Sequence, residues 1–454
     1  MKRICIHNAI IVNEGHQQKG SVVIENGKIA EVLLKEAQPS TPCDETIDAQ
    51  GSYLLPGVID DHVHFRDPGF TQKGDITTES QAAAAGGVTS IMDMPNTHPQ
   101  TTTIDALNAK FDLMAEKSLV NYSCYFGATN ANYTMLDSLD KKRVCGIKLF
   151  MGSSTGDMLV DKMNSLLNIF NGTDLLIAAH CEDHTTIKTN TEKYSKQYDE
   201  LKTKTFTGDL PTGYHAKIRS ITACYKSSEL AVRLARLADA RLHILHLSTS
   251  KELSLFDDLP LSEKRITAEA CVGHLLFNST HYASLKSRIK CNPAIKTNEN
   301  REALRKAVNS GLIDVIATDH APHLLSEKMG GALKAASGMP MIQFSLVSML
   351  GLVDENVFTI EKIVEKMCHA PAQIYGIANR GYIRPGYQAD LVLVRPGEKW
   401  TLTNDLILSK CKWSPLEGNS FNWKVEKTFV NGNLIYSDGQ VDENHRGQEL
   451  RFER

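Results

Sequence analysis

The middle of the chain alternates apolar segments with helical patterns, and this alternation limits the fold more than any other feature of the sequence. Eight segments are rich in Val, Ile, Leu and Ala and have the length of buried strands. They span residues 53–65, 87–95, 120–128, 144–151, 174–182, 241–248, 265–273 and 312–320. Helical patterns lie between most of them. Apolar strands that alternate with helices indicate a parallel sheet, and eight such units match a (β/α)8 barrel, with a doubly wound open sheet as the alternative.

Both ends of the chain differ from this middle region. Residues 1–53 and 377–454 contain short segments rich in β-branched residues, with Asn-Gly hairpin signals at 26–27 and 431–432. We therefore expect an α/β protein in which residues 54–376 form a TIM-like barrel. The two termini are expected to form one small composite β-sandwich domain.

Composition narrows the class of protein further. The 454 residues include 50 Lys and Arg against 53 Asp and Glu, so the net charge is only −3. This balance argues against nucleic acid or an anionic membrane as a partner. No apolar run approaches the ~18 residues of a membrane span, and the first residues lack the pattern of a signal peptide. Ten cysteines without a C-x-x-C pair indicate reduced thiols and a cytoplasmic protein.

Polar residues stand at the ends of several predicted strands. They are His62 and His64 in the first strand, Lys148 in the fourth, His180 in the fifth, His246 in the sixth and Asp319 in the eighth. In a barrel of this type the C-terminal strand ends converge on one mouth, where active sites are built. Burial of such side chains is costly unless they are paired or bind a metal, so their joint pattern predicts a shared metal centre.

The residue types fit that chemistry. In an H-x-H strand both imidazoles point to the same side, so His62 and His64 can bind one cation. Further histidines and a carboxylate complete a ligand set suited to zinc, with manganese or cobalt as alternatives. Lys148 is the exception, because an ammonium repels metals. If burial lowers its pKa, the neutral amine can react with CO2 to form a carbamate that bridges two ions.

A single strand histidine is usually structural, and only the joint pattern argues for ligands. Taken alone, Lys148 would most simply be a snorkelling or salt-bridged lysine and Asp319 a residue that orients a loop. The remaining histidines of the middle region are predicted to be structural: His184, His215, His243, His274 and His281.

Longer motifs around these residues resemble those of dihydroorotases in the amidohydrolase superfamily. The motifs are DDHVHFRDPGFTQKGD, MPNT, GIKLFMG, AAHCED, LHILHLST, CNPAIK and IATDHAPH, in the expected order over residues 60–323. The resemblance implies two divalent metal ions, with zinc as the first choice. One ion would be held by His62, His64 and Asp319 and the other by His180 and His246, with carboxylated Lys148 and a hydroxide bridging them. Related hydantoinases have a similar K-x-F-M context; some dihydroorotases use an Asp bridge instead, which leaves Asp157 as the alternative.

The resemblance also implies contacts to a small-molecule substrate. Dihydroorotate carries a carboxylate, and Arg66, two residues after the H-x-H motif, can bind a carboxylate through two N–H groups. A salt bridge with Asp67 is the structural alternative for Arg66. Asn96, Asn292 and His323 match further substrate contacts of the family.

The glycine-rich segment after His323 is expected to form a lid over the barrel mouth. Where the family commonly has G-L-E-T, this chain reads SGMPMIQF, so no residue is nominated from this part.

The predicted reaction is the reversible hydrolysis of dihydroorotate to N-carbamoyl-aspartate, with Asp319 as the base and then the acid. Two alternatives stay open. Another cyclic amidase, such as an allantoinase or dihydropyrimidinase, would share the metal ligands but give Arg66 no carboxylate partner. A non-catalytic homologue would serve as an assembly subunit, although such relatives typically lose metal ligands. A homodimer is compatible with the family resemblance.

Overall fold

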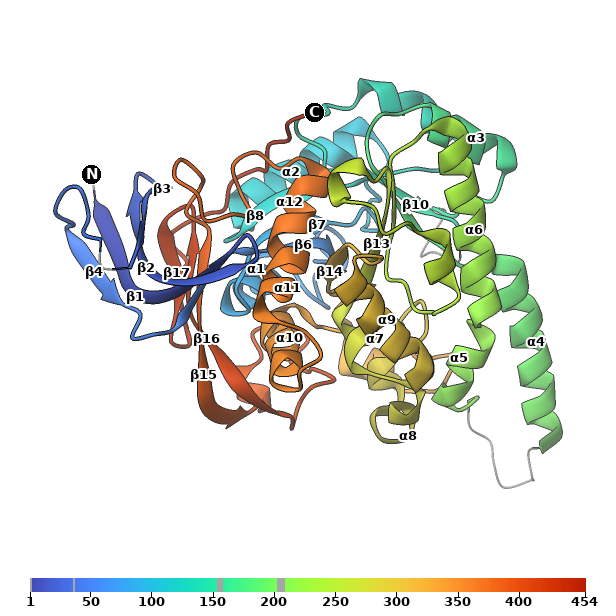
Figure 1. Cartoon of the computed structure of the whole chain (residues 1–454). Coiled ribbons are helices and arrows are strands. Elements are labelled where there is room, and N and C mark those ends of the chain that lie inside the picture. Colours follow the sequence, from blue (N-terminus) through green and yellow to red (C-terminus); the bar gives the residue numbers. More distant parts are fainter. Residues whose placement is uncertain (1, 36, 153–157, 202–208) are drawn as a thin grey trace.

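A computed structural model describes residues 2–35, 37–152, 158–201 and 209–454. Its centre is a barrel of parallel strands surrounded by helices (Figure 1). Among the described residues the barrel strands are β6 (Val58–Val63), β7 (Val88–Asp93), β8 (Asn121–Cys124) with β9 (Phe126–Gly127), β10 (Ile147–Phe150), β11 (Ile177–His180), β12 (Leu242–Ile244), β13 (Ile266–Cys271) and β14 (Val315–Ala317). These strands lie within the eight predicted segments. A parallel bridge between Val63 and His320 closes the barrel between its first and last strands.

Helices follow the strands and cover the outside of the barrel (Figure 1). They are α1 (Ile76–Ala85), α2 (Ile104–Lys117), α3 (Met163–Asn171), α4 (His184–Leu201), α5 (His215–Ile218), α6 (Ile221–Ala238), α7 (Val272–Leu276), α8 (Tyr282–Leu285), α9 (Asn298–Ser310), α10 (Ser345–Asp354), α11 (Ile360–Val364) and α12 (Ala370–Tyr375). Caps fix several of their starts. Asp75, for example, accepts a hydrogen bond from the Thr78 amide at 2.9 Å at the start of α1.

The first predicted segment is two strands rather than one. β5 (Tyr53–Pro56) pairs with β15 in the terminal sheet, whereas β6 begins the barrel. Gly57 separates them, and a Cβ atom there would lie only 2.1 Å from Thr89 Oγ1. The close approach of Thr89 therefore requires glycine at the point where the chain passes from one sheet to the other.

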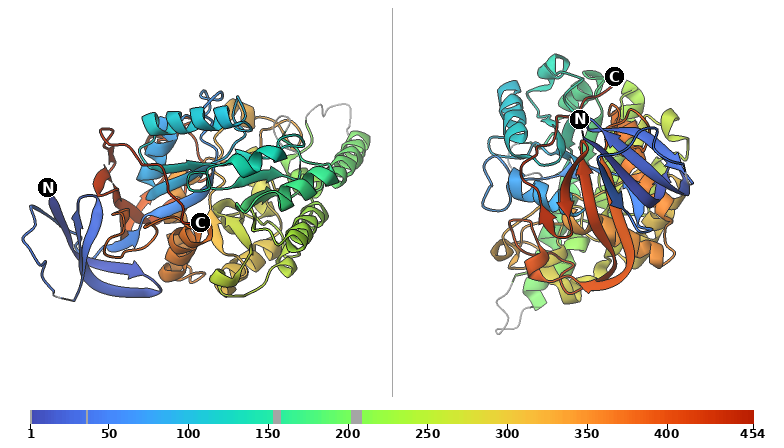
Figure 2. Two further views of the ribbon diagram at one scale, coloured as in Figure 1. Left: turned by 90° about the horizontal axis from the view of Figure 1, so that it is seen from above. Right: turned by 90° about the vertical axis from the view of Figure 1, so that its left-hand side faces the viewer.

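The terminal strands form one nine-stranded sheet at one end of the molecule (Figures 1 and 2). It contains β1 (Arg3–Asn13), β2 (His16–Glu25), β3 (Lys28–Leu34), β4 (Glu45–Asp48), β5, β15 (Leu391–Thr401), β16 (Ser420–Val430), β17 (Asn433–Ser437) and β18 (Gln440–Val441). β1 pairs with β4 through its first half and with β5 through its second half. The predicted fold class, a barrel with a separate sheet domain from both termini, is confirmed; the boundaries after residues 53 and 376 stay a prediction.

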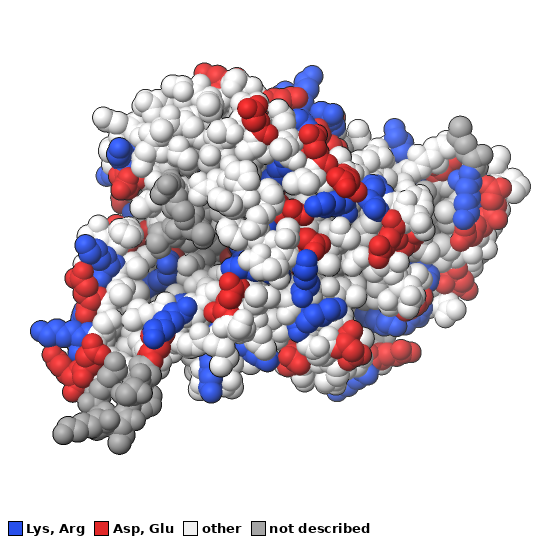
Figure 3. All heavy atoms as spheres, turned by 180° about the vertical axis from the view of Figure 1, so that it is seen from behind, with Lys and Arg blue, Asp and Glu red and all other residues white. Residues whose placement is uncertain are grey.

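The surface carries charges of both signs. Figure 3 shows acidic and basic side chains interspersed over one face, with no extended area of a single sign among the described residues. The ten cysteines are free thiols, nine of them buried. No helix in the described part of the chain is both long and apolar enough to cross a bilayer.

Candidate functional site

One cavity of about 420 Å³ opens at the C-terminal ends of the barrel strands. It is lined by all ten residues that the sequence nominated as metal ligands or substrate contacts: His62, His64, Arg66, Asn96, Lys148, His180, His246, Asn292, Asp319 and His323. Phe150, Arg219 and the segment 336–338 complete the wall. Asp157, the alternative bridging residue, lies outside the described residues.

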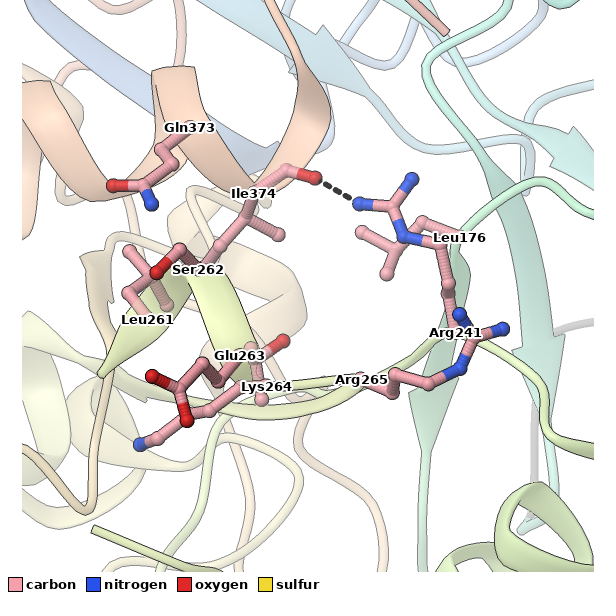
Figure 4. A pocket seen from close by; sticks show the side chains of 10 residues that line it. Leu176, Arg241, Leu261, Ser262, Glu263, Lys264, Arg265, Gln373 and Ile374 are labelled. Atoms are coloured by element: carbon pink, nitrogen blue, oxygen red, sulfur yellow. Dashed lines mark hydrogen bonds between the residues drawn. The ribbon is translucent and has the colours of Figure 1, made fainter. Parts of the chain in front are cut away.

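A smaller cavity of about 220 Å³ lies where strands β11 to β13 begin (Figure 4). Arg241 donates to the Ile374 carbonyl there, and Lys264 forms a 2.8 Å ion pair with Asp314. No histidine lines this cavity, as far as the described residues go. The concentration of imidazoles and carboxylates at the opposite end therefore identifies the larger cavity as the candidate functional site.

Three ligand-type atoms meet at the end of β6. His62 Nε2 and His64 Nε2 lie 3.2 and 3.1 Å from the same atom, Asp319 Oδ1. The other ring nitrogens are engaged elsewhere. His62 Nδ1 is 3.0 Å from Glu269 Oε1 and His64 Nδ1 is 2.7 Å from Asn96 Oδ1. Because carboxylate and amide oxygens accept, both Nδ1 atoms donate, and in the neutral rings both Nε2 lone pairs face Asp319.

Burial controls the charges of His62, His64 and Asp319. It lowers the pKa of His62 and of His64 to about 4, so both imidazoles are neutral near pH 7. Burial opposes ionisation of Asp319, but His62 and His64 outweigh it and hold the pKa of this carboxyl below its usual range. Two lone pairs and an anionic oxygen in contact need a cation between them, and neutral imidazole with carboxylate is a ligand set for a divalent metal.

A second pair of histidines stands across the cavity. His180 Nδ1 and His246 Nε2 are 2.9 Å apart, and their rings meet edge to face with centroids 4.8 Å apart. Burial lowers the pKa of both rings. His180 Nε2 is 3.2 Å from Glu182 Oε2, and Glu182 in turn forms an ion pair with Arg219. The Glu182 carboxylate can thus hold the His180 ring so that Nδ1 points at a shared metal position.

Lys148 lies in the middle of the cavity wall, on β10. Its side chain is only 1% exposed, and Nζ is 4.7 Å from the centre of the Phe150 ring. Burial lowers the Lys148 pKa to about 8, although Asp319 and Glu269 oppose this shift. At that pKa roughly a tenth of the amine is neutral at pH 7. The residues present therefore fit a metal centre with a reactive lysine, as the sequence predicts.

The other end of the cavity is lined by the cation Arg66, and Lys73 stands beside it in a 2.8 Å ion pair with Glu327. Arg66, 9% exposed, donates through Nε to the Pro322 carbonyl at 3.0 Å, and Nη2 is 3.1 Å from His323 Nε2. Lys73 Nζ is 3.3 Å from His323 Nδ1. Burial, followed by the cations Arg66, Lys73 and Lys328, lowers the His323 pKa to about 2. Asp67 pairs with Lys117 rather than with Arg66. This corner can receive an anion.

The two nominated asparagines are each anchored by a histidine. Asn96 Oδ1 accepts from His64, and Asn292 Oδ1 is 3.1 Å from His215 Nε2. Asn96 therefore orients the His64 ring in addition to lining the cavity. His215, predicted as structural, contacts Asn292 from α5.

Sequence reasoning missed several residues of the site. Glu182 stands two residues after His180 in AAHCED, so the alternation of side chains along the strand indicated its position. Arg219 lies in a stretch that reads as one helix from residue 215 to 238. The structure breaks that helix at Arg219, Ser220 caps α6, and the Arg219 side chain reaches Glu182. Nothing local marks that break, because it depends on Glu182, which follows β11.

Comparison with known proteins adds independent findings. The model of the Amidohydrolase family matches residues 53–435. The dihydroorotase of Methanosphaera stadtmanae is 32% identical over 422 residues, covering 93% of this chain and 94% of that protein. The allantoinase of Bacillus velezensis is 27% identical, covering 96% and 94%. The L-hydantoinase (dihydropyrimidinase) from Arthrobacter aurescens has a similar fold, with a TM-score of 0.90 at 24% identity over 99% of this chain and 100% of that one.

Proposed function

Because the chain belongs to the amidohydrolase family, we propose that it is a dihydroorotase, a metal-dependent cyclic amide hydrolase. The reaction is the reversible hydrolysis of (S)-dihydroorotate to N-carbamoyl-L-aspartate, a step of de novo pyrimidine biosynthesis. One observation carries the proposal. A single cavity combines a cage of neutral imidazoles and a carboxylate with a buried guanidinium. A ring amide that bears a carboxylate matches both halves of that cavity.

The donor set supports two divalent metal ions, with zinc as the first choice. His62, His64 and Asp319 would hold one ion, and His180 and His246 the other. Lys148 would join them as a carbamate: its neutral amine attacks CO2, a C–N bond forms and one proton leaves. When bound, the metal pair polarises the amide carbonyl and lowers the pKa of water towards neutrality.

Asp319 is the proton carrier in this scheme. Oδ1 lies against the two histidines, which leaves Oδ2 to take a proton from the attacking water and to return it to the ring nitrogen. Glu269 and Asn96 keep the His62 and His64 rings in the tautomer that presents Nε2. Neither imidazole is protonated near neutral pH, so both Nε2 lone pairs are available to a metal ion.

Arg66 and His323 orient the substrate. The Pro322 carbonyl fixes the guanidinium of Arg66, which can then bind the ring carboxylate without first losing much side-chain freedom. His323 is neutral, so it can share a hydrogen bond with the same carboxylate without adding charge. With the carboxylate held here, the ring amide is directed towards the histidine cage.

Turnover on several cyclic amides tests the proposal. Purified protein with its metals should hydrolyse dihydroorotate and, in reverse, cyclise N-carbamoyl-aspartate. Allantoin and dihydrouracil, which lack the ring carboxylate, should be poor substrates. The allantoinase relative at 27% identity makes allantoin the most informative competitor. Faster turnover of allantoin than of dihydroorotate would replace this proposal by the allantoinase alternative, and absence of turnover on all three would favour the non-catalytic one.

We also propose that the enzyme acts in the cytoplasm. The support is that all ten cysteines are free thiols, nine of them buried, and that none of them is paired in a disulfide.

A further inference from the structure

A second group of ligand-type side chains lies inside the barrel, outside the cavity. It is next to the catalytic cage, by which we mean the proposed metal ligands His62, His64, Lys148, His180, His246 and Asp319. Asp61 precedes His62 on β6, His243 lies on β12 three residues before His246, and Glu269 lies on β13. All three side chains are fully buried. One ligand atom from each lies within 4.8 Å of the other two. We call this group the inner triad.

Hydrogen bonding fixes the orientation of the His243 ring. Nδ1 lies 2.7 Å from Thr267 Oγ1, and that hydroxyl donates to the Leu242 carbonyl at 3.3 Å. The hydroxyl proton is therefore in use, and Thr267 accepts the proton of Nδ1. In the neutral ring Nε2 then carries a lone pair, which faces Asp61 Oδ2 at 3.4 Å and Glu269 Oε2 at 3.9 Å.

The polar atoms that meet in the inner triad have no hydrogen-bond partner within the described parts of the chain. They are both carboxylate oxygens of Asp61, Glu269 Oε2 and His243 Nε2. The other oxygen of Glu269 is fully used, since it accepts from the His246 amide, from Cys271 and from His62 Nδ1. Buried carboxylate oxygens are rarely left unpaired, because desolvation without a partner costs several kcal/mol.

The spacing favours a metal ion over a shared proton. An N–H···O hydrogen bond needs about 2.7–3.2 Å, which is shorter than both distances at Nε2. In tetrahedral zinc sites, bonds of about 2.0–2.2 Å separate neighbouring N and O ligands by about 3.3–3.5 Å. The 3.4 Å separation of His243 and Asp61 falls in that range, and the 3.9 Å separation of His243 and Glu269 is slightly longer.

We propose that Asp61, His243 and Glu269 bind a third divalent cation, separate from the catalytic pair. Its role is structural: it satisfies the buried oxygens and fixes Glu269, the carboxylate that orients His62. This inference goes beyond the proposed function, because a cyclic amidase of any specificity could carry such an ion. His243, which the sequence predicted to be a structural histidine, would then be a metal ligand.

Metal analysis of matched variants of the full-length protein tests the proposal. Wild-type protein loaded with zinc should hold three equivalents per chain by mass spectrometry, and Asp61→Asn should hold two. Lys148→Ala, which disrupts the catalytic cage, should retain one. Cys271→Ala is the control, since Cys271 contacts Glu269 Oε1, on the side of His62, and not Oε2, the oxygen that faces His243. It should keep all three equivalents.

Anomalous diffraction at the zinc edge provides a second measurement that does not depend on the folding of any variant. A wild-type crystal should give a peak between Asp61 Oδ2 and His243 Nε2. Two equivalents in the wild type with no such peak would overturn the proposal, as would a third equivalent that survives in Asp61→Asn. Loss of the third ion in Cys271→Ala but not in Asp61→Asn would assign it to His62, Glu269 and Cys271 instead. None of these outcomes depends on which cyclic amide the enzyme hydrolyses.

Discussion

Replacement of Arg66 by glutamine should lower kcat/KM for dihydroorotate by about two orders of magnitude. Glutamine keeps the length needed to reach the Pro322 carbonyl but removes the positive charge. The backbone of Arg66 is left-handed, with φ +68°, so a β-branched replacement would add strain that has nothing to do with the substrate. Glutamine avoids that complication.

The magnitude follows from the burial of the guanidinium. Arg66 is 9% exposed and fixed by the Pro322 carbonyl, so its charge is only partly screened. Opposite charges ~4 Å apart at an effective dielectric of ~20 attract by about 4 kcal/mol, and a hydrogen bond to a charged group adds about 1.5–3 kcal/mol. Desolvation of the substrate carboxylate offsets part of this gain. A net loss of about 3 kcal/mol corresponds to a factor of about 10².

Steady-state assays with two substrates separate recognition from damage to the site. Turnover of dihydrouracil, which has no carboxylate, should change less than about threefold in Arg66→Gln, because the charge contributes nothing to its binding. Arg66→Lys keeps the charge but loses the planar fork and should lose about tenfold on dihydroorotate. Arg288→Gln, at a partly exposed ion pair with Glu417, controls for the change of net charge. If Arg66→Gln lowers kcat/KM equally for both substrates, or for neither of them, the anchoring role is refuted.

Three further outcomes are expected. Asp319→Asn should retain metal by elemental analysis while kcat falls by about 10²–10⁴, the usual contribution of a general base; near wild-type turnover would exclude Asp319 as the proton carrier. Native mass spectrometry should find the added mass of one CO2 in the wild type and not in Lys148→Ala, which should also bind less metal. Lys328→Met takes the Lys328 donor from the Ala336 and Gly338 carbonyls, and from the Lys290 carbonyl, which keeps the Gly338 amide as a donor. The variant should cost about 3 kcal/mol in denaturant unfolding. Burial lowers the Lys328 pKa to about 7, so above that pH the unfolded chain binds more protons than the folded one, and the stability deficit of this variant should widen up to about pH 10.4.

The barrel and the residues that line its mouth were predictable because they depend on local patterns. Eight apolar segments and their order define the strands, and the alternation of side chains puts His62 and His64 on one side of the first strand. Their convergence with His180, His246 and Asp319 then follows from barrel geometry, which brings the C-terminal strand ends together. All these residues line one cavity.

Residues whose role depends on a distant partner were not predictable in this way. Lys328 stands in a polar, glycine-rich segment typical of a solvated loop, yet it is buried and donates to carbonyls of its own segment and of Lys290. Arg219 ends a helix that its sequence would continue, because Glu182 binds its guanidinium. Asp61 and His243 are far apart in sequence, and only the closed barrel brings them within 3.4 Å of each other. Each case needs a tertiary contact that no local pattern records.

The charge of the cavity indicates more about the substrate than the fold does. A TM-score of 0.90 to an L-hydantoinase establishes the barrel and the sheet domain, but a similar fold at 24% identity does not identify the substrate. A histidine cage would serve any cyclic amide. The corner formed by Arg66, His323 and Lys73 would not, because a buried guanidinium without an anionic ligand is left with an incompletely compensated charge. A neutral hydantoin or dihydrouracil would leave that cost in place when it binds, whereas a carboxylate on the ring would remove it. In the proposed binding mode, Arg66 would therefore discriminate against uncharged analogues of dihydroorotate.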